Sequence, residues 1–543
     1  MTSHGCGFDA LLRPADVVVV GAGPVGLKLA LDLADAGLEV ILLESGRDGR
    51  DAAAQALSTA EIVDPDRHAA MDLAVQRGFG GTSALWGGRA VPFDPVDFET
   101  RGFAPGAAWP IDAAEVEPWY AAACAFLDCG PAVFEAPLPG LPDMAGLTAR
   151  HLERWCARND MGAVHGARVA RHPKIRLALG ATVLAVACAG GAASGLKVAM
   201  GGATARVTAK AYAIAAGGVE TARLLLASRD EASPRLGGEA LGRFYMGHAF
   251  GSIADIQFLR PGDDKAFTFH KDASGRYVRR RLTLSAEVQR EEGLLNMAAW
   301  PDLPELYDPG HRSAILSLAY LALKTPVIGP RLMSEAIRLR KIGPGGRVGG
   351  HLWNVIKGAP GAAWFAARFL AARYSKVRLP GFFVLNGAHR YALHYHAEHL
   401  PDAESRVSLG EARDALGMRR AVIDLKFGAA DAESIVRTHE AMARRMEAAG
   451  YARVIHAHPP EARAAAVLAQ ASDGFHQIGT ARMGRDPATS VVDENARVHG
   501  VKNLFVAGSA VLPSSGQANP TLLALALAGR LAHHLTEFIP QGS

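Results

Sequence analysis

Three glycines, at positions 21, 23 and 26, follow a run of apolar β-branched residues, Val17–Val20. A strand that ends in Gly-x-Gly-x-x-Gly and continues into a helix is the pattern that binds a dinucleotide. Gly21 allows the tight turn, Gly23 lets a pyrophosphate approach the helix N-terminus, and Gly26 permits close packing of helix on strand. Glu44, 18 residues after Gly26, can accept hydrogen bonds from ribose hydroxyls. NAD and FAD both carry an ADP half, so this motif predicts a dinucleotide site without distinguishing them.

The elements around this motif must hold the glycines at the end of a buried strand. The apolar pattern predicts a strand at residues 17–20, a helix at 27–36 that stops at Gly37, and a second strand at 39–43. A β-branched run without polar interruption is typical of a parallel strand buried on both faces. The fold class is therefore predicted to be α/β.

Five further segments place glycines and polar residues in a set order. They are Gly80-Gly81-Thr82-Ser83-Ala84-Leu85-Trp86-Gly87-Gly88, Ala213–Leu224, His476–Gly484, Val498–Ser509 and Gly516–Leu522. With the first motif, they resemble the glucose–methanol–choline (GMC) family of FAD-dependent oxidoreductases in the family's order. The resemblance is nearest to the pyranose 2-oxidase-like branch and is strong over residues 15–100, 175–255 and 470–535. It implies an α/β (α+β overall) architecture, in which a Rossmann-like FAD-binding domain is interleaved with a substrate domain built on an antiparallel sheet.

The resemblance also implies a division of the chain. We expect residues 1–105, 175–255 and 470–543 to form the FAD-binding domain. Residues 106–174 and 256–469 would form the substrate-binding domain, with an antiparallel sheet near 380–410 and a helix at 431–450. Residues 190–195, which are rich in glycine, are predicted to be the tip of a hairpin.

The cofactor implied by the resemblance is FAD. The residues expected to bind it are Gly21, Gly23, Pro24, Gly26, Glu44, Ser45, Gly80, Gly81, Thr82, Ser83, Trp86, Gly87, Gly88, Val183, Ala216, Gly217, Gly508, Ser509, Asn519, Pro520 and Thr521. The pyranose 2-oxidase branch attaches its flavin through a His, and the matching position here is Leu85. We therefore expect FAD to be bound non-covalently. Gly508 is a second departure, because many family members carry an acid there.

Two residues match the family's catalytic positions. Oxidation of an alcohol removes a proton from oxygen and a hydride from carbon, and the flavin N5 takes the hydride in this family. His476 matches the catalytic His, and an imidazole with a pKa of about 6.5 suits a base near neutral pH; a structural His beside a glycine turn is the alternative. Asn519 matches the second position and would donate to the substrate oxygen, although Asn before Pro is also an ordinary helix N-cap. A helix that starts at Pro520–Thr521 would direct its positive end at the negative charge of a reduced flavin.

A second group of histidines alternates along residues 391–399. As a strand, this segment would place His394, His396 and Glu398 on one face. Such a set can bind a transition metal, but we expect substrate-facing or structural roles and no metal. His248 is expected to be structural.

Residues 311–380 are strongly basic. Twelve Lys and Arg residues against Glu335 give this insert a formal charge of +11, which leaves −7 for the rest of a chain whose total is +4. Three interpretations stay open: a solvated basic face, contact with an anionic membrane surface, and steering of an acidic substrate. Nucleic-acid binding is not expected, because the charge is local and no nucleic-acid-binding motif accompanies it.

The five cysteines form neither a disulfide framework nor a C-x-x-C metal spacing, and Met1–Asp16 lacks the features of a secretory signal. We therefore expect a cytoplasmic protein. The leading hypothesis is an FAD-dependent dehydrogenase or oxidase that converts a CH–OH group of a sugar, glycoside or polyol to a carbonyl, with O₂ or a quinone-like acceptor. The alternatives are the same chemistry on a lipid-linked or sterol-like alcohol, and a flavin-fold binding protein without turnover.

Overall fold

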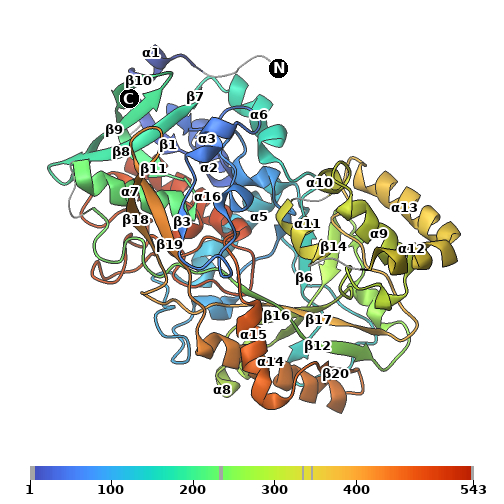
Figure 1. Ribbon diagram of the computed structural model, residues 1–543. Coiled ribbons are helices and arrows are strands. Elements are labelled where there is room, and N and C mark those ends of the chain that lie inside the picture. Colours follow the sequence, from blue (N-terminus) through green and yellow to red (C-terminus); the bar gives the residue numbers. More distant parts are fainter. Residues whose placement is uncertain (1–5, 232–235, 333–334, 344–346, 540–543) are drawn as a thin grey trace.

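A computed structural model describes residues 6–539 except 232–235, 333–334 and 344–346. Its first large sheet is parallel, with the strand order β21-β11-β1-β2-β7. The strands are Leu504–Val506, Ala209–Ile214, Ala15–Val20, Val40–Glu44 and Ile175–Leu179. They come from three distant parts of the chain and lie together in the upper part of Figure 1. The sheet confirms the predicted α/β class; the domain boundaries stay a prediction.

The predicted strand, turn and helix at the start of this sheet are confirmed. β1 is buried along Val17–Val20, and α2 (Pro24–Asp35) begins four residues later. Gly21 has a φ of 101°, and a Cβ on Gly26 would stand 1.8 Å from the Gly21 oxygen. Neither position accepts a side chain, because the first needs a left-handed backbone and the second lies against the turn.

A three-stranded antiparallel sheet, β8 (Ala181–Ala189), β9 (Ala192–Met200) and β10 (Ala203–Val207), adjoins the first sheet. The hairpin tip predicted at 190–195 is shorter than expected, since residues 192–195 already belong to β9. Gly190 and Gly191 make the turn, with φ values of 58° and 75°. Two consecutive residues with positive φ close a hairpin whose twist matches that of its strands, so no longer loop is needed.

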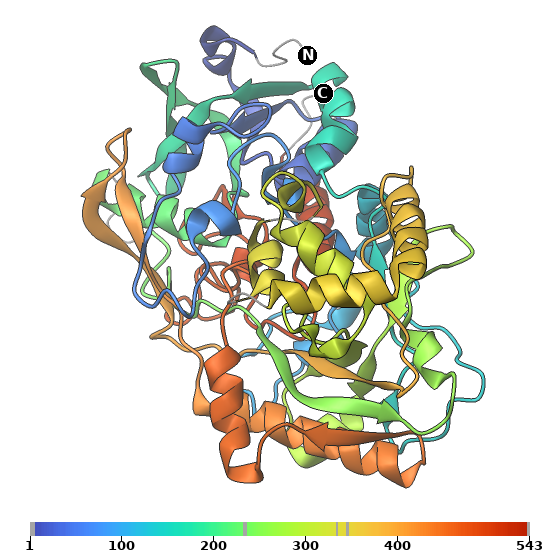
Figure 2. The same ribbon diagram turned by 45° about the vertical axis from the view of Figure 1, so that its right-hand side comes forward.

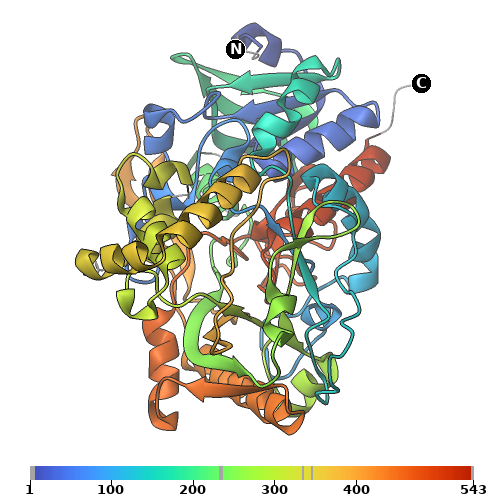
Figure 3. The same ribbon diagram turned by 90° about the vertical axis from the view of Figure 1, so that its right-hand side faces the viewer.

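The second large sheet is antiparallel, with the order β20-β12-β17-β16-β15-β5. Its strands are Ala452–His456, Ala249–Phe258, Arg390–Ala397, Met297–Asp302, Leu282–Leu284 and Leu147–Thr148. The helices α14 (Ala429–Ala448) and α15 (Pro460–Gln470) pack beside it, at the bottom of Figure 3. The predicted antiparallel sheet is therefore confirmed, with β17 inside it, and α14 corresponds to the helix predicted at 431–450.

Smaller elements complete the frame. Two further sheets have the orders β13-β14-β6-β4 and β18-β19-β3. Their strands are His270–Lys271, Tyr277–Arg280, Leu152–Trp155, Arg89–Ala90, Arg406–Arg413, Arg419–Asp424 and Glu61–Ile62. The remaining helices are α1 (Phe8–Leu11), α3 (Ala52–Ala56), α4 (Met71–Ala74), α5 (Ala113–Leu127), α6 (Met161–Arg171), α7 (Gly218–Glu231) and α8 (Ala286–Glu292). Short 3-10 helices are η1 (Gly81–Ala84), η2 (Pro95–Phe98), η3 (Asp263–Phe267), η4 (Pro309–His311) and η5 (Ser509–Val511).

The basic insert folds into helices that lie on one side of the molecule, shown in yellow in Figure 2. They are α9 (Ala314–Lys324), α10 (Gly329–Leu332), α11 (Glu335–Ile342), α12 (Val348–Lys357) and α13 (Ala359–Arg373). α9 is the inner helix, and α10 to α13 each contact it. Leu316, Tyr320 and Leu323 of α9 form a small hydrophobic cluster with Leu306. The insert is thus a separate helical layer beside the two large sheets.

The last helix, α16 (Thr521–Phe538), packs against α2 and α5. Its first turns are almost completely buried, from Leu522 to Leu527. Within the ranges that the structure describes, no helix combines the length and apolar character needed to cross a membrane. The burial of α16 fixes its N-terminus between the two large sheets, where the candidate site lies.

Candidate functional site

A cavity of about 1340 Å³ lies between the two large sheets. Its walls come from the ends of β1 and β2, the 80–88 loop, strands β12, β16 and β17, and the start of α16. The predicted cofactor residues that line it are Gly21, Gly23, Pro24, Glu44, Ser45, Gly81, Thr82, Ser83, Trp86, Gly87, Val183, Ala216, Gly217, Gly508, Ser509, Asn519, Pro520 and Thr521. The volume exceeds the range of about 300–1000 Å³ that is typical of small-molecule sites. The cavity therefore has room for a dinucleotide and a second molecule.

Three predicted cofactor residues do not line the cavity. Gly26 packs against the Gly21 turn. Gly80 has a φ of 93°, and a Cβ there would stand 2.7 Å from the Gly162 backbone nitrogen. Gly88 has a φ of 76°. These glycines shape the loops behind the wall rather than face a ligand.

Glu44 stands at the end of β2, where the ribose-binding carboxylate was predicted. Its Oε2 accepts a hydrogen bond from the Ala22 NH at 2.9 Å, and its Oε1 accepts one from the Gly46 NH at 2.8 Å. Burial raises the pKa of Glu44, and the two NH groups oppose that rise. The backbone thus fixes the carboxylate at the wall of the cavity beside Gly21 and Gly23.

Three glycines in the cavity wall leave space for an extended cofactor to lie close to the backbone. A Cβ added to Gly23, Gly217 or Gly508 would meet no atom within 4 Å, and all three glycines line the cavity. The N-terminus of α2 opens beside Gly23, and free NH groups at such a terminus bind phosphate. These residues fit the ADP half of FAD at one end of the cavity, and the remaining volume accommodates the flavin half.

The 80–88 loop is held by its own polar residues. Ser83 Oγ donates to the Gly80 carbonyl at 2.6 Å and accepts from the Met161 NH at 3.0 Å. Trp86 Nε1 donates to the Asn159 carbonyl at 2.6 Å. Leu85 lines the cavity with a purely hydrocarbon side chain, which offers no atom for a bond to flavin. Non-covalent binding stays a prediction that this side chain supports.

His476 and Asn519 come together in the cavity although they lie on different loops. His476 Nδ1 lies 3.0 Å from Asp473 Oδ2, and its Nε2 lies 2.8 Å from Asn519 Nδ2. A carboxylate accepts hydrogen bonds only, so Nδ1 carries the proton and Nε2 keeps a lone pair. The Asn519 amide donates to that lone pair. His476 therefore presents an unprotonated Nε2 in the cavity wall.

Asp473 organises the loop before His476. Its Oδ1 accepts from the NH groups of Phe475 and His476, at 2.9 and 3.2 Å, and its Oδ2 accepts from the His248 NH at 2.7 Å. Burial alone would raise the pKa of Asp473, but its electrostatic interactions and hydrogen bonds with His476 and His248 lower it to about 2. The carboxylate is therefore ionised at neutral pH and fixes the His476 tautomer.

Asn519 does not cap the following helix. α16 begins at Thr521 after Pro520, and no side chain caps it. The Asn519 Nδ2 group is used by His476, while its Oδ1 is buried and has no hydrogen-bond partner among the described residues. The N-cap alternative from the sequence is wrong, because the amide turns toward His476.

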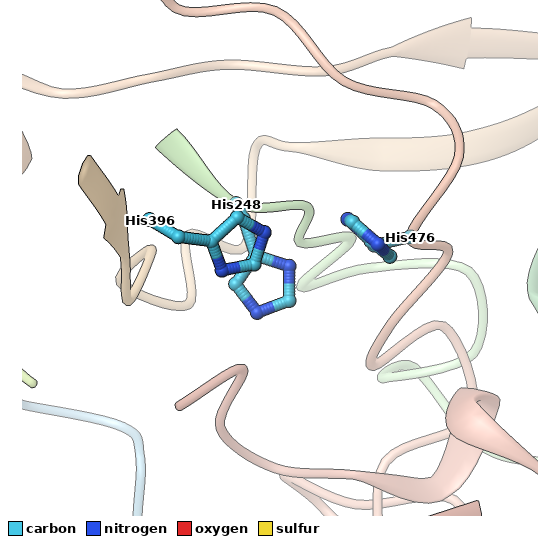
Figure 4. A group of neighbouring side chains, drawn as sticks. All are labelled: His248, His396 and His476. Carbon is cyan, nitrogen blue, oxygen red and sulfur yellow. The ribbon is translucent and has the colours of Figure 1, made fainter. Parts of the chain in front are cut away.

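Two further histidines lie against His476, as Figure 4 shows. The rings of His248 and His396 stack with centroids 4.3 Å apart, and His476 stands edge-on at 4.7 and 5.4 Å. His248 Nε2 lies 3.2 Å from the Ser515 carbonyl, and His396 Nδ1 lies 2.7 Å from the Gln517 carbonyl. Burial lowers the pKa of both rings well below the usual value, so they are neutral at pH 7.

These three rings are close enough to be considered as metal ligands, since one nitrogen atom from each ring lies within 4.8 Å of the other two. A metal ion binds the in-plane lone pairs of imidazoles. The stacked rings of His248 and His396 direct those lone pairs past each other, and His476 uses both nitrogens in hydrogen bonds. The geometry of the cluster therefore does not favour a metal site, and the neutral rings of His248 and His396 lie beside His476.

In the second possible metal-binding set, His394, His396 and Glu398, the carboxylate is already hydrogen-bonded by other residues. Glu398 accepts two hydrogen bonds from Arg101, at 2.8 and 2.6 Å, and a third from the Asn296 NH at 3.0 Å. His394 lies over Trp300 instead, with ring centroids 5.0 Å apart, and lines the cavity. The set of His394, His396 and Glu398 does not form a ligand group.

An arginine pair forms part of the cavity wall on the side of the antiparallel sheet. Arg89 and Arg279 both contact Glu153, whose side chain is completely buried. Their guanidinium carbons each lie 4.8 Å from the centre of the Trp300 ring. Asp302, held ionised by Lys341, lines the same part of the cavity, and its pKa is lowered to about 2 although burial opposes this. An aromatic ring flanked by fixed charges suits a polar, hydroxyl-bearing ligand.

Sequence reasoning missed three residues that complete this arrangement. Asp473 had a local signal, because an Asp two and three residues before free NH groups is typical of an Asx turn. Gln517, which accepts from Arg281 at 2.6 Å and donates to Asp94 at 2.9 Å, holds the loop before Asn519. Arg89 had no signal in the sequence. Its partners are distant in the chain.

Two segments of the chain match models of known protein families. Residues 401–528 match the model of the GMC oxidoreductase family, and residues 14–63 match that of an FAD binding domain. The chain is 35% identical over 136 residues to paromamine 6'-oxidase of Streptomyces fradiae, covering 25% of this chain and 23% of that protein. It is 36% identical over 64 residues to pyranose 2-oxidase of Tricholoma matsutake, covering 12% and 11%. The matches thus span less than a quarter of these relatives.

A solved structure supports the fold. Pyridoxine 4-oxidase from Mesorbium loti superimposes with a TM-score of 0.52 at 17% identity, covering 96% of this chain and 98% of that chain. At this identity the likeness concerns the arrangement of elements. The shared arrangement covers nearly all of this chain, including the parts outside the two matched segments.

Proposed function

Since the chain is a GMC-family flavoprotein with an FAD binding domain at residues 14–63, we propose that it oxidises a CH–OH group to a carbonyl, with His476 as the base. The observation that carries this proposal is the pairing of His476 Nε2 with Asn519 Nδ2 at 2.8 Å in the wall of the large cavity. A lone pair and an amide donor then face the same volume. That is what the oxygen of an alcohol needs as it loses its proton.

The residues divide the reaction between them. A substrate hydroxyl that takes the place of the Asn519 amide donates its proton to His476 Nε2. Asp473, ionised and hydrogen-bonded to Nδ1, stabilises the resulting imidazolium. Asn519 then donates to the substrate oxygen as negative charge develops there. The neutral rings of His248 and His396 add no competing charge behind the base.

FAD, when bound, supplies the acceptor for the hydride that leaves the same carbon. The residues that would hold it are those of the glycine-lined end of the cavity, with Glu44 toward the ribose and Gly23 toward the pyrophosphate. The positive end of α16 would lie toward the flavin end. We propose that FAD is held without a covalent bond, because Leu85 stands where an attachment would need a nucleophilic side chain.

A sugar, glycoside or polyol is the proposed substrate. Arg89 and Arg279 offer hydrogen-bond donors in the cavity wall beside Trp300, and Asp302 adds an acceptor. Two of the relatives are named as oxidases of paromamine and of a pyranose. The terminal electron acceptor is proposed to be O₂ or a quinone.

A second candidate is a lipid-linked alcohol, and a specific observation favours it. Leu306, Leu323, Leu332, Phe369 and Phe382 line the part of the cavity that borders the helical insert. An apolar tail would occupy this part, with its hydroxyl at His476. Membrane contact by the insert belongs to this candidate. We retain the cytoplasm as the proposed location, because all five cysteines are free thiols.

An anaerobic screen tests the proposal. The purified holoenzyme would be mixed with sugars, glycosides, polyols and lipid alcohols, and the loss of flavin absorbance recorded. Bleaching by a member of one class, with formation of the matching carbonyl, supports oxidation and selects between the two substrate classes. A protein that keeps its flavin oxidised with every class is a binding protein without turnover.

A further inference from the structure

Helix α12 is folded with its two uncharged polar residues, His351 and Asn354, inward and most of its large apolar residues outward. His351 is completely buried, with Nδ1 3.1 Å from Ser317 Oγ and Nε2 3.1 Å from the Tyr307 carbonyl. Asn354 donates to the Pro309 carbonyl at 2.9 Å and to Ser317 at 3.1 Å. The outward face consists of Val348, Leu352, Trp353 and Ile356, which are 40%, 50%, 57% and 68% exposed. A surface helix in water has the opposite arrangement.

Helix α13 continues this apolar exposure. Phe365 and Phe369 face inward and pack against Phe382, with ring centroids 5.3 and 5.4 Å apart. Trp364 and Leu370, on the outward side, and Tyr374 at the helix end are exposed. A helix that is apolar on both sides is normally buried on both sides. The outward side of α13 therefore exposes apolar residues that, in a helix of this composition, normally pack against a partner.

The exposed apolar residues are concentrated in this part of the molecule. Nineteen large apolar side chains are exposed among the described residues, and eleven of them lie between residues 327 and 385. The two exposed tryptophans, Trp353 and Trp364, are both among the eleven. Scattered exposure is ordinary, but a cluster of this kind marks an interaction surface.

The basic residues around this cluster indicate the charge of the surface that it binds. Lys357 Nζ lies 4.9 Å from the Trp353 ring, and the Arg368 guanidinium lies 5.8 Å from the Trp364 ring. Arg347 and Lys376 are exposed near the two ends of the helix pair, and α12 and α13 contain no acidic residue. A second copy docking through the same face would bring these four basic residues against the same four of its partner. An anionic surface has the complementary charge.

We propose that the outward face of α12 and α13, defined by Val348, Leu352, Trp353, Ile356, Trp364, Leu370 and Tyr374 and flanked by Arg347, Lys357, Arg368 and Lys376, docks on an anionic lipid bilayer. Tryptophan and tyrosine prefer the interface between headgroups and acyl chains, and basic residues bind anionic headgroups. The protein is bound to one leaflet and does not span it, in agreement with the helices that the structure describes.

The docking face lies on the opposite side of the insert from the cavity. Phe369 and Phe382, on the inner side, line the cavity, and so does Arg373. Docking would therefore place the helical insert between the lipid surface and the apolar end of the cavity. Delivery of a lipid-linked alcohol to His476 rests on the proposed function, whereas docking itself does not.

Flotation of the holoenzyme with vesicles tests the proposal. The vesicles are pure phosphatidylcholine, or phosphatidylcholine and phosphatidylglycerol in a ratio of about 2:1, at about 0.05 M and about 0.5 M salt. We expect flotation with the anionic vesicles at low salt and a shift of tryptophan fluorescence to shorter wavelength. The double variant Trp353→Ser/Trp364→Ser should lose about tenfold or more of the partitioning.

A matched double variant removes exposed apolar side chains elsewhere. Val133→Ser/Leu416→Ser should float like the parent protein. Flavin content and thermal midpoint are measured for both variants, so that a folding defect is not taken for lost docking. If Trp353→Ser/Trp364→Ser lowers the midpoint, the charge variant Lys357→Glu/Arg368→Glu replaces it.

The proposal is overturned if the parent protein does not float with anionic vesicles, or if the tryptophan and charge variants float as well as the parent protein does. Self-association that the tryptophan variant abolishes, without vesicle binding, would assign the face to a second copy and also overturn it. None of these readouts requires turnover, so a failure here leaves the oxidation test untouched.

Discussion

The Nε2 atom of His476 lies 2.8 Å from the amide nitrogen of Asn519, although 43 residues separate them in the chain. This contact fixes the direction of the His476 lone pair only because Asp473 holds the opposite nitrogen at 3.0 Å. The three residues therefore act as one unit. Each can be tested separately.

Asp473→Asn should slow flavin reduction by about a hundredfold while leaving the substrate KM nearly unchanged. The amide nitrogen of Asn can donate to His476 Nδ1, which would move the proton to Nε2 and remove the lone pair. The rate is measured under anaerobic conditions as a function of pH. As a positioning residue, Asp473 should change the shape of the pH profile as well as its height. A variant with the parent's profile and a rate within about twofold of it would contradict this role.

Asn519→Ala should lower the rate of flavin reduction by about 10- to 100-fold, because the substrate oxygen loses a hydrogen-bond donor as charge develops. Since Asn519 does not cap α16, the thermal midpoint should stay close to that of the parent protein. Rapid-mixing spectroscopy and a thermal scan of the same preparation check both statements. A large drop in the midpoint with an unchanged rate would show that Asn519 is a structural residue.

Stability should fall as the pH drops below about 6.5, where the unfolded state begins to protonate His248 and His396. Burial holds the pKa of both rings well below that value in the folded state. Between the two values the unfolded state binds more protons, so stability is complete above the unfolded pKa and is lost as the pH falls. Each ring contributes up to about 1.4 kcal/mol per pH unit.

The variant His396→Gln isolates one of these contributions. Its amide can donate to the Gln517 carbonyl in place of Nδ1, and it does not titrate. Thermal midpoints at pH 7.5 and pH 5.5 (about one unit on either side of the unfolded value) should therefore differ less in the variant than in the parent protein. Equal differences would mean that His396 is protonated in the folded state.

FAD should leave the protein on acid precipitation. Leu85 offers no nucleophilic atom to the cavity, so the yellow colour is expected in the supernatant and the pellet should be colourless. The absorbance of both fractions at the flavin bands checks this. Flavin that stays with the pellet after washing would show attachment through another residue.

Gly23→Val should weaken FAD binding by about tenfold or more without disturbing the fold. Gly23 has an extended backbone with a φ of −72°, and a Cβ there meets no protein atom within 4 Å. The side chain would instead occupy the space for the pyrophosphate. Gly102→Val, at an open position outside the cavity, is the control. Equal flavin content in the two variants would contradict the assigned position of the cofactor.

The sequence predicted the parts of the fold that depend on local patterns. Val17–Val20, the glycine turn and Glu44 follow one another within 30 residues, and each has a conformational requirement of its own. The antiparallel strand around His394 and the helix α14 likewise have clear periodicity. The hairpin at Gly190 was predicted too long, because composition alone does not show how many of the glycines take a positive φ.

Contacts between residues that are distant in the chain could not be predicted from the sequence. Arg89 meets Glu153 and Arg279 only after three strands assemble. Gln517 lies two residues before Asn519, and its partners Arg281 and Asp94 lie hundreds of residues away in the chain. The outward apolar face of α12 was hidden for the same reason. The composition of α12 is ordinary. Only the inward direction of the His351 side chain shows that the apolar face of the helix points outward.

The central claim is that His476 takes the proton from the alcohol, and anaerobic reduction of the bound flavin in His476→Ala tests it most directly. With a substrate found in the screen, the variant should retain FAD and reduce it about 10²- to 10⁴-fold more slowly than the parent protein. The rate should be extrapolated to saturating substrate, so that weaker binding is not counted. Reduction at the parent rate, with FAD bound, would contradict the account.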